Sequence, residues 1–300
     1  MASENNMAVL LMSYGSPTRM EDVRAYLEDI YEGEDVPEYA IRENMEKYAM
    51  VNGVSPSNAI IDTLIHKLIR SLGSGFSVYL GNKHWKPKIQ DVLNNIRDEG
   101  DEKILAIPLF PFPSVNVRDS YYIPLKESLR GMQWEPSVQF VNGFWEERGF
   151  QETWNEILKP FQEQDAYFLF DAHSLPTFRH PEPEYDASFR SASENIAVSA
   201  GLKKWTVGYQ SRGKYGSSWL EPSIYDVAKS IVKDGGSDSI VTVPVGFCYE
   251  HLEVLYDLDH EFGETLKTMG AKYMRTPLPN YMDPWVEMFS EIIRRRSIDF

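Results

Sequence analysis

One stretch of this sequence recurs 135 positions further along the chain, and the repeat limits the folds that the chain can adopt. Residues 86–100 are KPKIQDVLNNIRDEG and residues 221–235 are EPSIYDVAKSIVKDG, so proline, aspartate, valine, glycine and two isoleucines recur in place. A similar apolar triplet follows each copy, at Ile107–Leu109 and at Val243–Val245. The repeat predicts two homologous domains of one architecture.

Apolar runs alternate with helical periodicity along the chain. Residues 7–13, MAVLLMS, are continuously apolar, as in a strand that is buried on both faces of a parallel sheet. The same criteria predict further strands at 76–81, 103–110, 137–142, 166–171, 205–209 and 239–245. Helices are predicted at 19–31, 37–50, 57–72, 87–99, 117–130, 150–163, 186–200 and 222–234. Strands that alternate with helices predict βαβ units with right-handed crossovers.

We therefore expect an α/β fold of two similar Rossmann-like domains, residues 1–145 and 146–300, whose parallel sheets face a central cleft. In such folds, ligands bind at the carboxyl ends of the strands. The pattern leaves open whether the C-terminal helix packs back onto the first domain.

Composition excludes several classes of protein. A hydrophobic content of 42% with 25% charged residues is typical of soluble globular proteins. No apolar run approaches the roughly 18 residues of a membrane span, and the first residues lack the pattern of a signal peptide. The single cysteine, Cys248, excludes an internal disulfide and any four-cysteine metal site. We expect a cytoplasmic monomer, and the net charge of −15 argues against a nucleic-acid partner.

Known nucleotide and hydrolase motifs are missing from the sequence. It contains no G-x-G-x-x-G, no P-loop, no H-E-x-x-H and no G-x-S-x-G. Dinucleotide-binding, P-loop and serine-hydrolase functions are therefore disfavoured despite the α/β pattern, and we expect no organic cofactor.

An acidic segment follows the strand expected at 239–245. At about 100° per residue, a helix here would have Leu255, Leu258 and Phe262 on its buried face. The opposite face would carry the polar side chains Glu253, Asp257, His260, Glu261 and Glu264. Like charges four residues apart repel, and carboxylates with an interleaved histidine suit a divalent cation. The pattern alone leaves open a metal site and a solvated helix face.

Three further residues lie at or just after predicted strand ends. His173 ends the apolar run YFLF, and an imidazole there could accept a proton near physiological pH, although a structural role is the alternative. Tyr14 holds the equivalent position in the first half, where a phenol could ligate a metal or pack on a flat ligand. His84 follows the strand at 76–81.

Taken together, these segments resemble the ferrochelatase family, most closely the short soluble coproporphyrin ferrochelatases of Gram-positive bacteria. The matching motifs are MSYGSP (12–17), GVSP (53–56), GNKH (81–84), AHSLP (172–176), VGYQS (207–211) and VPVGF with HLEVLYD (243–247 and 251–257). They occur in the family's order over essentially the whole chain. The resemblance implies a lyase of haem biosynthesis that inserts Fe²⁺, as substrate, into a porphyrin.

The resemblance also implies roles for individual residues. His173 matches the histidine that faces the ring and is thought to take the pyrrole protons, and Glu253 matches the catalytic carboxylate opposite metal insertion; both are also candidate metal ligands. Asp257 and Glu261 match the acidic row that continues from Glu253 toward solvent, and they are candidate metal ligands. Tyr14 matches a proposed metal contact on the other side of the macrocycle. Other residues expected along the porphyrin cleft are Ile30, Ser55, Arg118 and Tyr121.

A peripheral divalent ion, Mg²⁺ or another, is also compatible with the family. His84 matches a surface histidine that binds metal in some members.

Two segments depart from the family pattern. Many bacterial relatives have a histidine where this chain has PFPS at 111–114. Members often carry an arginine pair followed by glycine where this chain has IYEGED at 30–35, so charges that would bind propionates are missing there. Remaining candidates for propionate binding are Arg42, Arg118 and Arg212.

Other functions stay open from the sequence. The resemblance favours coproporphyrin III over protoporphyrin IX as the porphyrin. A chelatase for another divalent metal would use similar ligands, because oxygen and imidazole also admit Co²⁺, Ni²⁺ and Zn²⁺. A non-catalytic tetrapyrrole carrier would keep the cleft without turnover, and a sugar- or amino-acid-binding protein would share only the architecture.

Overall fold

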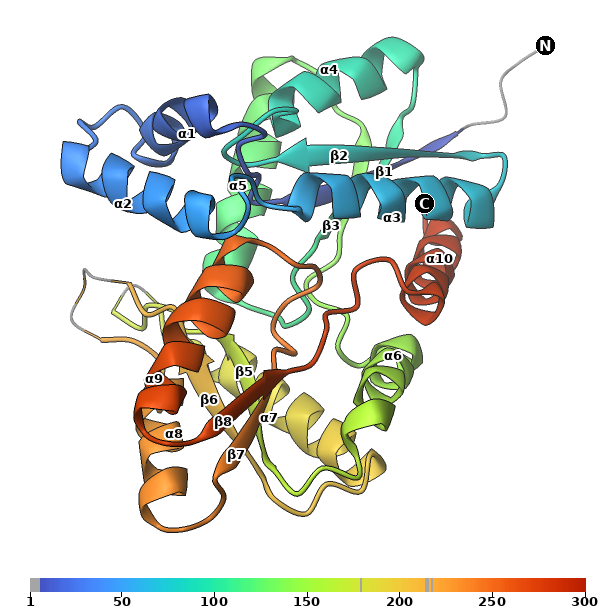
Figure 1. Ribbon diagram of the computed structural model, residues 1–300. Helices are drawn as coiled ribbons and strands as arrows, with labels where there is room; N and C mark the ends of the chain where they lie inside the picture. The colour runs from blue at the N-terminus through green and yellow to red at the C-terminus, as the bar shows by residue number, and fades with distance from the viewer. Residues whose placement is uncertain (1–5, 179, 214–215, 217) are drawn as a thin grey trace. The chain divides into compact units, whose positions relative to one another are not determined.

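The structure is a computed structural model that describes residues 6–178, 180–213, 216 and 218–300 (Figure 1). The chain divides into two compact units. Unit 1 comprises the described residues up to Leu109 together with Val117–Asn142 and Asn280–Phe300, and unit 2 comprises Phe110–Asn116 and Gly143–Pro279.

Unit 1 is built on a four-stranded parallel sheet with the strand order β2-β1-β3-β4. Its strands are β1 (Met7–Ser13), β2 (Phe76–Asn82), β3 (Lys103–Pro108) and β4 (Ser137–Phe140). Its helices are the short 3₁₀ turn Met20–Asp22, α1 (Val23–Ile30), α2 (Glu38–Met50), α3 (Ser57–Leu72), α4 (Ile89–Glu99), most of α5 (Val115–Gly131) and α10 (Asp283–Ser297). Every residue of β1 is buried, as the continuous apolar run predicted.

Unit 2 repeats this plan with the strand order β6-β5-β7-β8. Its strands are β5 (Tyr167–His173), β6 (Trp205–Gln210), β7 (Ser239–Val243) and β8 (Lys272–Arg275). Its helices are α6 (Arg148–Leu158), the 3₁₀ turn Lys159–Phe161, α7 (Pro183–Ser199), α8 (Ile224–Lys233), a π-helix (Val254–Phe262) and α9 (Gly263–Thr268). The predicted α/β fold with two similar Rossmann-like halves is confirmed.

The sequence repeat corresponds to helices α4 and α8 and the turns that lead into them. Each turn contains a cis proline, Pro87 or Pro222, whose carbonyl accepts a 2.8 Å hydrogen bond from the end of the preceding strand. Each strand carries a glycine against the first helical isoleucine. A Cβ added at Gly81 would lie 3.2 Å from Cα of Ile89, and one at Gly208 would lie 3.2 Å from Cα of Ile224. The repeat therefore preserves a close approach of helix to strand that glycine permits.

The two units differ from the expected division at residues 145 and 146. Segment Phe110–Asn116 belongs to unit 2, where the buried carboxylate of Glu182 accepts hydrogen bonds from Ser114 Oγ, Val115 N and Asn116 N at 2.8–3.2 Å. These bonds use backbone N–H groups at the start of α5 that have no partner inside the helix.

Helix α10 belongs to unit 1, which answers the question that the sequence left open. Its apolar face packs on α3, and Arg294 Nη2 donates to the Ser71 carbonyl at 2.6 Å. Strand β8 was not predicted, because it has only four residues and none of them is fully buried. No helix in the described part of the chain has the length and apolarity needed to cross a membrane.

The central strand of unit 2 contains a buried acid, Asp171. Its side chain is 0% exposed, and neither carboxylate oxygen has a hydrogen-bond partner among the residues that the structure describes. Burial raises the pKa of the Asp171 carboxyl well above its usual range, the Arg275 guanidinium partly opposes that shift, and Asp259 adds to it.

We expect the substitution Asp171→Asn to change the pH dependence of stability. Because the pKa of the carboxyl is higher in the folded than in the unfolded protein, folding is favoured at acidic pH and unfolding free energy is lost as the pH rises. An amide does not titrate. The melting temperature of the variant relative to wild type should therefore rise by a few degrees from about pH 5 to about pH 8.

The substitution Asp165→Asn provides a control, because the pKa of this carboxyl is shifted in the opposite direction to that of Asp171. A hydrogen bond from Lys204 Nζ, at 2.9 Å, lowers the pKa of exposed Asp165, so this carboxylate stabilises the fold above its unfolded pKa. The melting temperature of this variant relative to wild type should not rise over the same range. If the melting temperatures of Asp171→Asn and wild type instead changed with pH in parallel, the raised pKa of the Asp171 carboxyl would be contradicted.

Candidate active site

His173 lies at the carboxyl end of β5, in register with Gln210 at the end of β6. Its Nδ1 is 2.6 Å from the carbonyl oxygen of Ser174. A carbonyl can only accept, so Nδ1 carries the hydrogen and Nε2 of the neutral ring keeps its lone pair. Nε2 lies 3.7 Å from Oε2 of Glu253. The imidazole is therefore arranged to accept a proton at Nε2 next to a carboxylate that stabilises the resulting cation.

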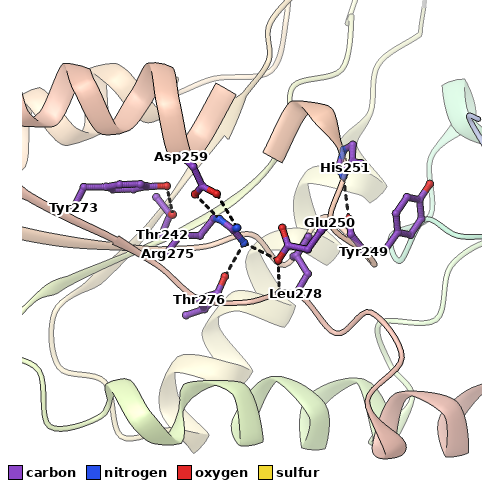
Figure 2. A network of polar contacts seen from close by, with 9 residues as sticks. All are labelled: Thr242, Tyr249, Glu250, His251, Asp259, Tyr273, Arg275, Thr276 and Leu278. Atoms are coloured by element: carbon purple, nitrogen blue, oxygen red, sulfur yellow. Dashed lines mark hydrogen bonds and ion pairs between the residues drawn. The ribbon is translucent and has the colours of Figure 1, made fainter. Parts of the chain in front are cut away.

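A second histidine, His251, approaches the same carboxylate oxygen. Its Nδ1 is 2.9 Å from the Tyr249 carbonyl oxygen (Figure 2), and its Nε2 is 3.7 Å from Oε2 of Glu253. His251 could not be identified as a site residue from periodicity, because it lies outside any periodic face. Its place two residues before Glu253, just after a predicted strand, was the available signal. The Glu253 carboxylate thus faces two imidazoles that share one hydrogen-bonding pattern.

The acidic segment forms a π-helix, so the expected α-helical winding is wrong. Backbone bonds to the fifth preceding residue make a wider turn, and residues four apart then align more closely than in an α-helix. Val254, Leu258 and Phe262 form the buried row. Glu253, Asp257 and Glu261, each one position earlier, form a parallel row in which Glu253 and Glu261 are exposed.

Two side chains change place with this winding. Leu255, expected in the core, is only half-buried. His260, seven positions after Glu253, leaves the acidic row, and its ring packs on Tyr256 with 5.4 Å between ring centroids. The row consists of carboxylates without an interleaved histidine.

Tyr225 of α8 lies beside this row. Its ring packs edge-on against Phe262, at 5.3 Å between centroids. Burial raises the pKa of the Tyr225 phenol, and the charges of Glu261 and Asp257 raise it further. The phenol therefore stays protonated next to the two acids.

Arg275 pairs with one acid before the π-helix and with another inside it (Figure 2). Its guanidinium pairs with Asp259 of the π-helix through two bonds of 2.6 and 2.8 Å. Its Nη1 donates at 3.0 Å to Glu250, which precedes the π-helix and also accepts from the backbone N of Leu278 at 3.2 Å. Burial alone would lower the pKa of Arg275, but Asp259 and Glu250 outweigh it and raise that pKa.

In unit 1, Tyr14 and His84 form a packed pair. Tyr14 follows β1, is 44% exposed and has its ring centroid 4.6 Å from that of His84. Nζ of Lys83 lies 5.9 Å from the Tyr14 ring centroid, at cation–π distance. The pair gives the Tyr14 phenol a fixed, solvent-exposed position.

The surface position that the resemblance implied for His84 is wrong. This side chain is 5% exposed, and its Nδ1 is 3.2 Å from Oδ2 of Asp29, which also pairs with Lys88. Burial, followed by the charge of Lys83, lowers the pKa of His84. A neutral buried imidazole supports Tyr14 rather than presenting a surface ligand.

The remaining expected porphyrin contacts all lie in unit 1. Ile30 ends α1 and is half-buried. Ser55 is 6% exposed and donates to Ser57 Oγ at 3.0 Å. Tyr121 is 9% exposed because it packs in the core among β1, β3, α4 and α5, which does not suit contact with a ligand.

Two of the three arginines considered for propionate binding, Arg118 and Arg212, have acidic partners of their own. Arg118 donates to Asp119 Oδ1 at 2.9 and 3.0 Å, and Arg212 donates to Glu221 at 3.2 Å. In residues 6–178, 180–213, 216 and 218–300, no three His, Cys, Asp or Glu side chains are grouped so that they could hold a metal ion.

Cys248 lies in the loop between β7 and the π-helix and is 3% exposed. Burial raises the pKa of its thiol well above the usual range. The only thiol of the chain therefore stays protonated and unreactive.

Comparisons with known proteins identify the family. The ferrochelatase family model matches residues 6–297. A protein named ferrochelatase from Thermoplasma acidophilum is 40% identical over 289 residues, covering 96% of this chain and 90% of the relative. Coproporphyrin III ferrochelatase 2 from Bacillus cereus is 30% identical over 308 residues, covering 98% and 95%.

Solved structures agree on the fold. SirB from Bacillus subtilis with Fe³⁺ matches with a TM-score of 0.60 at 11% identity, covering 97% of this chain and 95% of that one. CbiX, the terminal enzyme of sirohaem biosynthesis in denitrifying bacteria, matches with a TM-score of 0.54 at 14% identity, covering 96% and 98%. The solved structures establish only the fold, whereas the sequence matches span nearly the whole chain and establish the family. This chain belongs to the ferrochelatase family, whose members are lyases that insert a metal into a porphyrin.

Proposed function

We propose that this protein inserts Fe²⁺ into coproporphyrin III, in preference to protoporphyrin IX, in haem biosynthesis. The observation that carries the proposal is the position of His173 Nε2, a base at 3.7 Å from the Glu253 carboxylate. Two pyrrole protons must leave the macrocycle as a divalent ion enters, so the reaction needs a proton acceptor beside negative charge. Relatives named coproporphyrin III ferrochelatase support the choice of porphyrin.

In this mechanism His173 Nε2 takes the pyrrole proton and Glu253 stabilises the imidazolium. The Nδ1 hydrogen bond to the Ser174 carbonyl keeps the ring in the required tautomer. His251, oriented in the same way, is a second group that can receive a proton from the Glu253 side.

The acidic row supplies oxygen ligands to the incoming ion. Glu253, Asp257 and Glu261 follow one line along the π-helix, and carboxylates hold Fe²⁺ less tightly than thiolates would. Loose binding suits an ion that must be handed to the macrocycle.

The first test is anaerobic insertion of Fe²⁺ followed by absorbance, with coproporphyrin III and protoporphyrin IX assayed side by side. We expect turnover of both, with a higher kcat/KM for coproporphyrin III. Faster turnover of protoporphyrin IX would overturn the substrate preference. Tight porphyrin binding without insertion of Fe²⁺ would favour a carrier, and insertion of another divalent ion alone would favour a different chelatase.

Substitution of His173 by alanine should remove the proton acceptor. Loss of a general base lowers rates by about 100- to 10,000-fold, so kcat should fall by that order while porphyrin binding, followed by fluorescence quenching, stays measurable. His66→Ala is the matched control, because His66 is exposed on α3 and its ring contacts Asp62, one turn earlier in the same helix. Wild-type turnover by His173→Ala would exclude His173 from the reaction.

Removing the negative charge of residues in the acidic row should weaken the binding of Fe²⁺. Asp257→Asn and Glu261→Gln should each raise the KM for Fe²⁺ by roughly tenfold, with little change in porphyrin affinity. Glu264→Gln is the control, since Glu264 lies beyond the π-helix in α9 and pairs with Lys267 at 3.3 Å. If the KM for Fe²⁺ were unchanged in both Asp257→Asn and Glu261→Gln, the acidic row would be only a solvated helix face without a role in metal binding.

A further inference from the structure

We propose that Ser211 is a positioning residue that holds the Asp257 carboxylate at a fixed place relative to the strand edge carrying His173. The proposal rests on the proposed function, because it concerns how the acidic row receives the metal. It adds a residue outside the π-helix whose task is to orient one member of that row.

The backbone of Ser211 is unusual for its residue type. Ser211 follows the last residue of β6 and has φ of +54°, in the left-handed region. Only glycine adopts this region freely, and asparagine and aspartate tolerate it better than serine does. Such a conformation persists where the surroundings fix it, and these positions concentrate at functional sites.

In this backbone conformation, the Ser211 hydroxyl lies within hydrogen-bonding distance of the Asp257 carboxylate. Ser211 Oγ donates to Asp257 Oδ2 at 2.6 Å, across 46 positions of sequence. Behind it, Gln210 Nε2 donates to Ser211 Oγ at 3.2 Å. Because the amide supplies a hydrogen to Oγ, the hydroxyl hydrogen is directed to the carboxylate, and the two bonds reinforce each other.

Gln210 anchors this chain of bonds to the edge that carries His173. Its side chain is 1% exposed, its residue pairs with His173 in the β5–β6 register, and its carbonyl accepts from Ser174 N at 2.8 Å. The carbonyl of Ser174 in turn accepts from the His173 ring. The same dipeptide therefore fixes both the backbone beside the proton acceptor and the carboxylate that stands in the acidic row.

Ser211→Gly separates the two effects of this residue. Glycine adopts φ of +54° without strain but removes the hydroxyl. We expect a melting temperature equal to or above wild type, together with a KM for Fe²⁺ raised roughly tenfold, as for loss of a hydrogen bond to a charged group. A residue with a merely structural role would change the melting temperature and leave the metal KM unaltered.

Two companion variants make the comparison specific. Ser211→Ala also loses the hydroxyl but keeps the Cβ in the left-handed region, so it should raise the metal KM equally and melt below Ser211→Gly. Gln133→Gly is the backbone control, because exposed Gln133 has φ of +50° between α5 and β4 of unit 1. It should match the effect of Ser211→Gly on melting without changing the metal KM.

A double-mutant cycle with Asp257→Asn closes the test in the anaerobic Fe²⁺ assay. If Ser211 acts through Asp257, Ser211→Gly should change the metal KM little once Asp257 is an amide. An equal effect in both backgrounds, or an unchanged metal KM in Ser211→Gly alone, would overturn the proposal while leaving the proposed function intact. A wild-type protein that inserts no metal would overturn the function itself, and this inference with it.

Discussion

The buried guanidinium of Arg275 is the interaction on which the geometry of the site depends. It neutralises Asp259 inside the π-helix and Glu250 before it, so one strand residue fixes the entry and the middle of the acidic segment. Removing the guanidinium would leave the mostly buried Glu250 carboxylate, and the more exposed Asp259, without their cation. The Asp259 carboxylate lies close to Asp171, a buried acid with no hydrogen-bond partner in the described part of the chain. The acidic row is thus held in place by a cation that takes no part in it.

The two halves of the chain keep one plan and differ where their strands end. Both have a parallel sheet of the same order, and both place a helix after a cis proline against a strand glycine. After β3 the chain continues through PFPS into α5, whereas after β7 it enters the π-helix. The repeated scaffold is therefore shared, and among the described residues the π-helix with its row of acids follows a strand of unit 2. Ligand sites at such strand ends are the general rule for parallel α/β folds.

The sequence predicted the scaffold well because burial leaves a strong pattern in it. Continuous apolar runs and helical periodicity located most strands and helices, and the repeat fixed the symmetry. The π-helix could not be recognised, since glutamate and aspartate at every fourth position satisfy both windings over so short a segment. Side-chain environments were harder still to predict: His84 is buried and pairs with Asp29, 55 positions away, a contact that sequence spacing does not reveal. His251 and Ser211 were missed as site residues because their partners are set by tertiary packing rather than by spacing.

The buried thiol of Cys248 has a consequence for the chemistry of iron. Cysteine becomes sulfenic acid, or captures soft metals, through its thiolate, and the reaction requires access from solvent. Cys248 precedes Glu253 by only a few positions, yet its thiol is enclosed and kept protonated. A redox-active ion in the acidic row would therefore meet no cysteine thiolate to oxidise, and a soft ion such as Cu⁺ would find no sulfur anion there to bind.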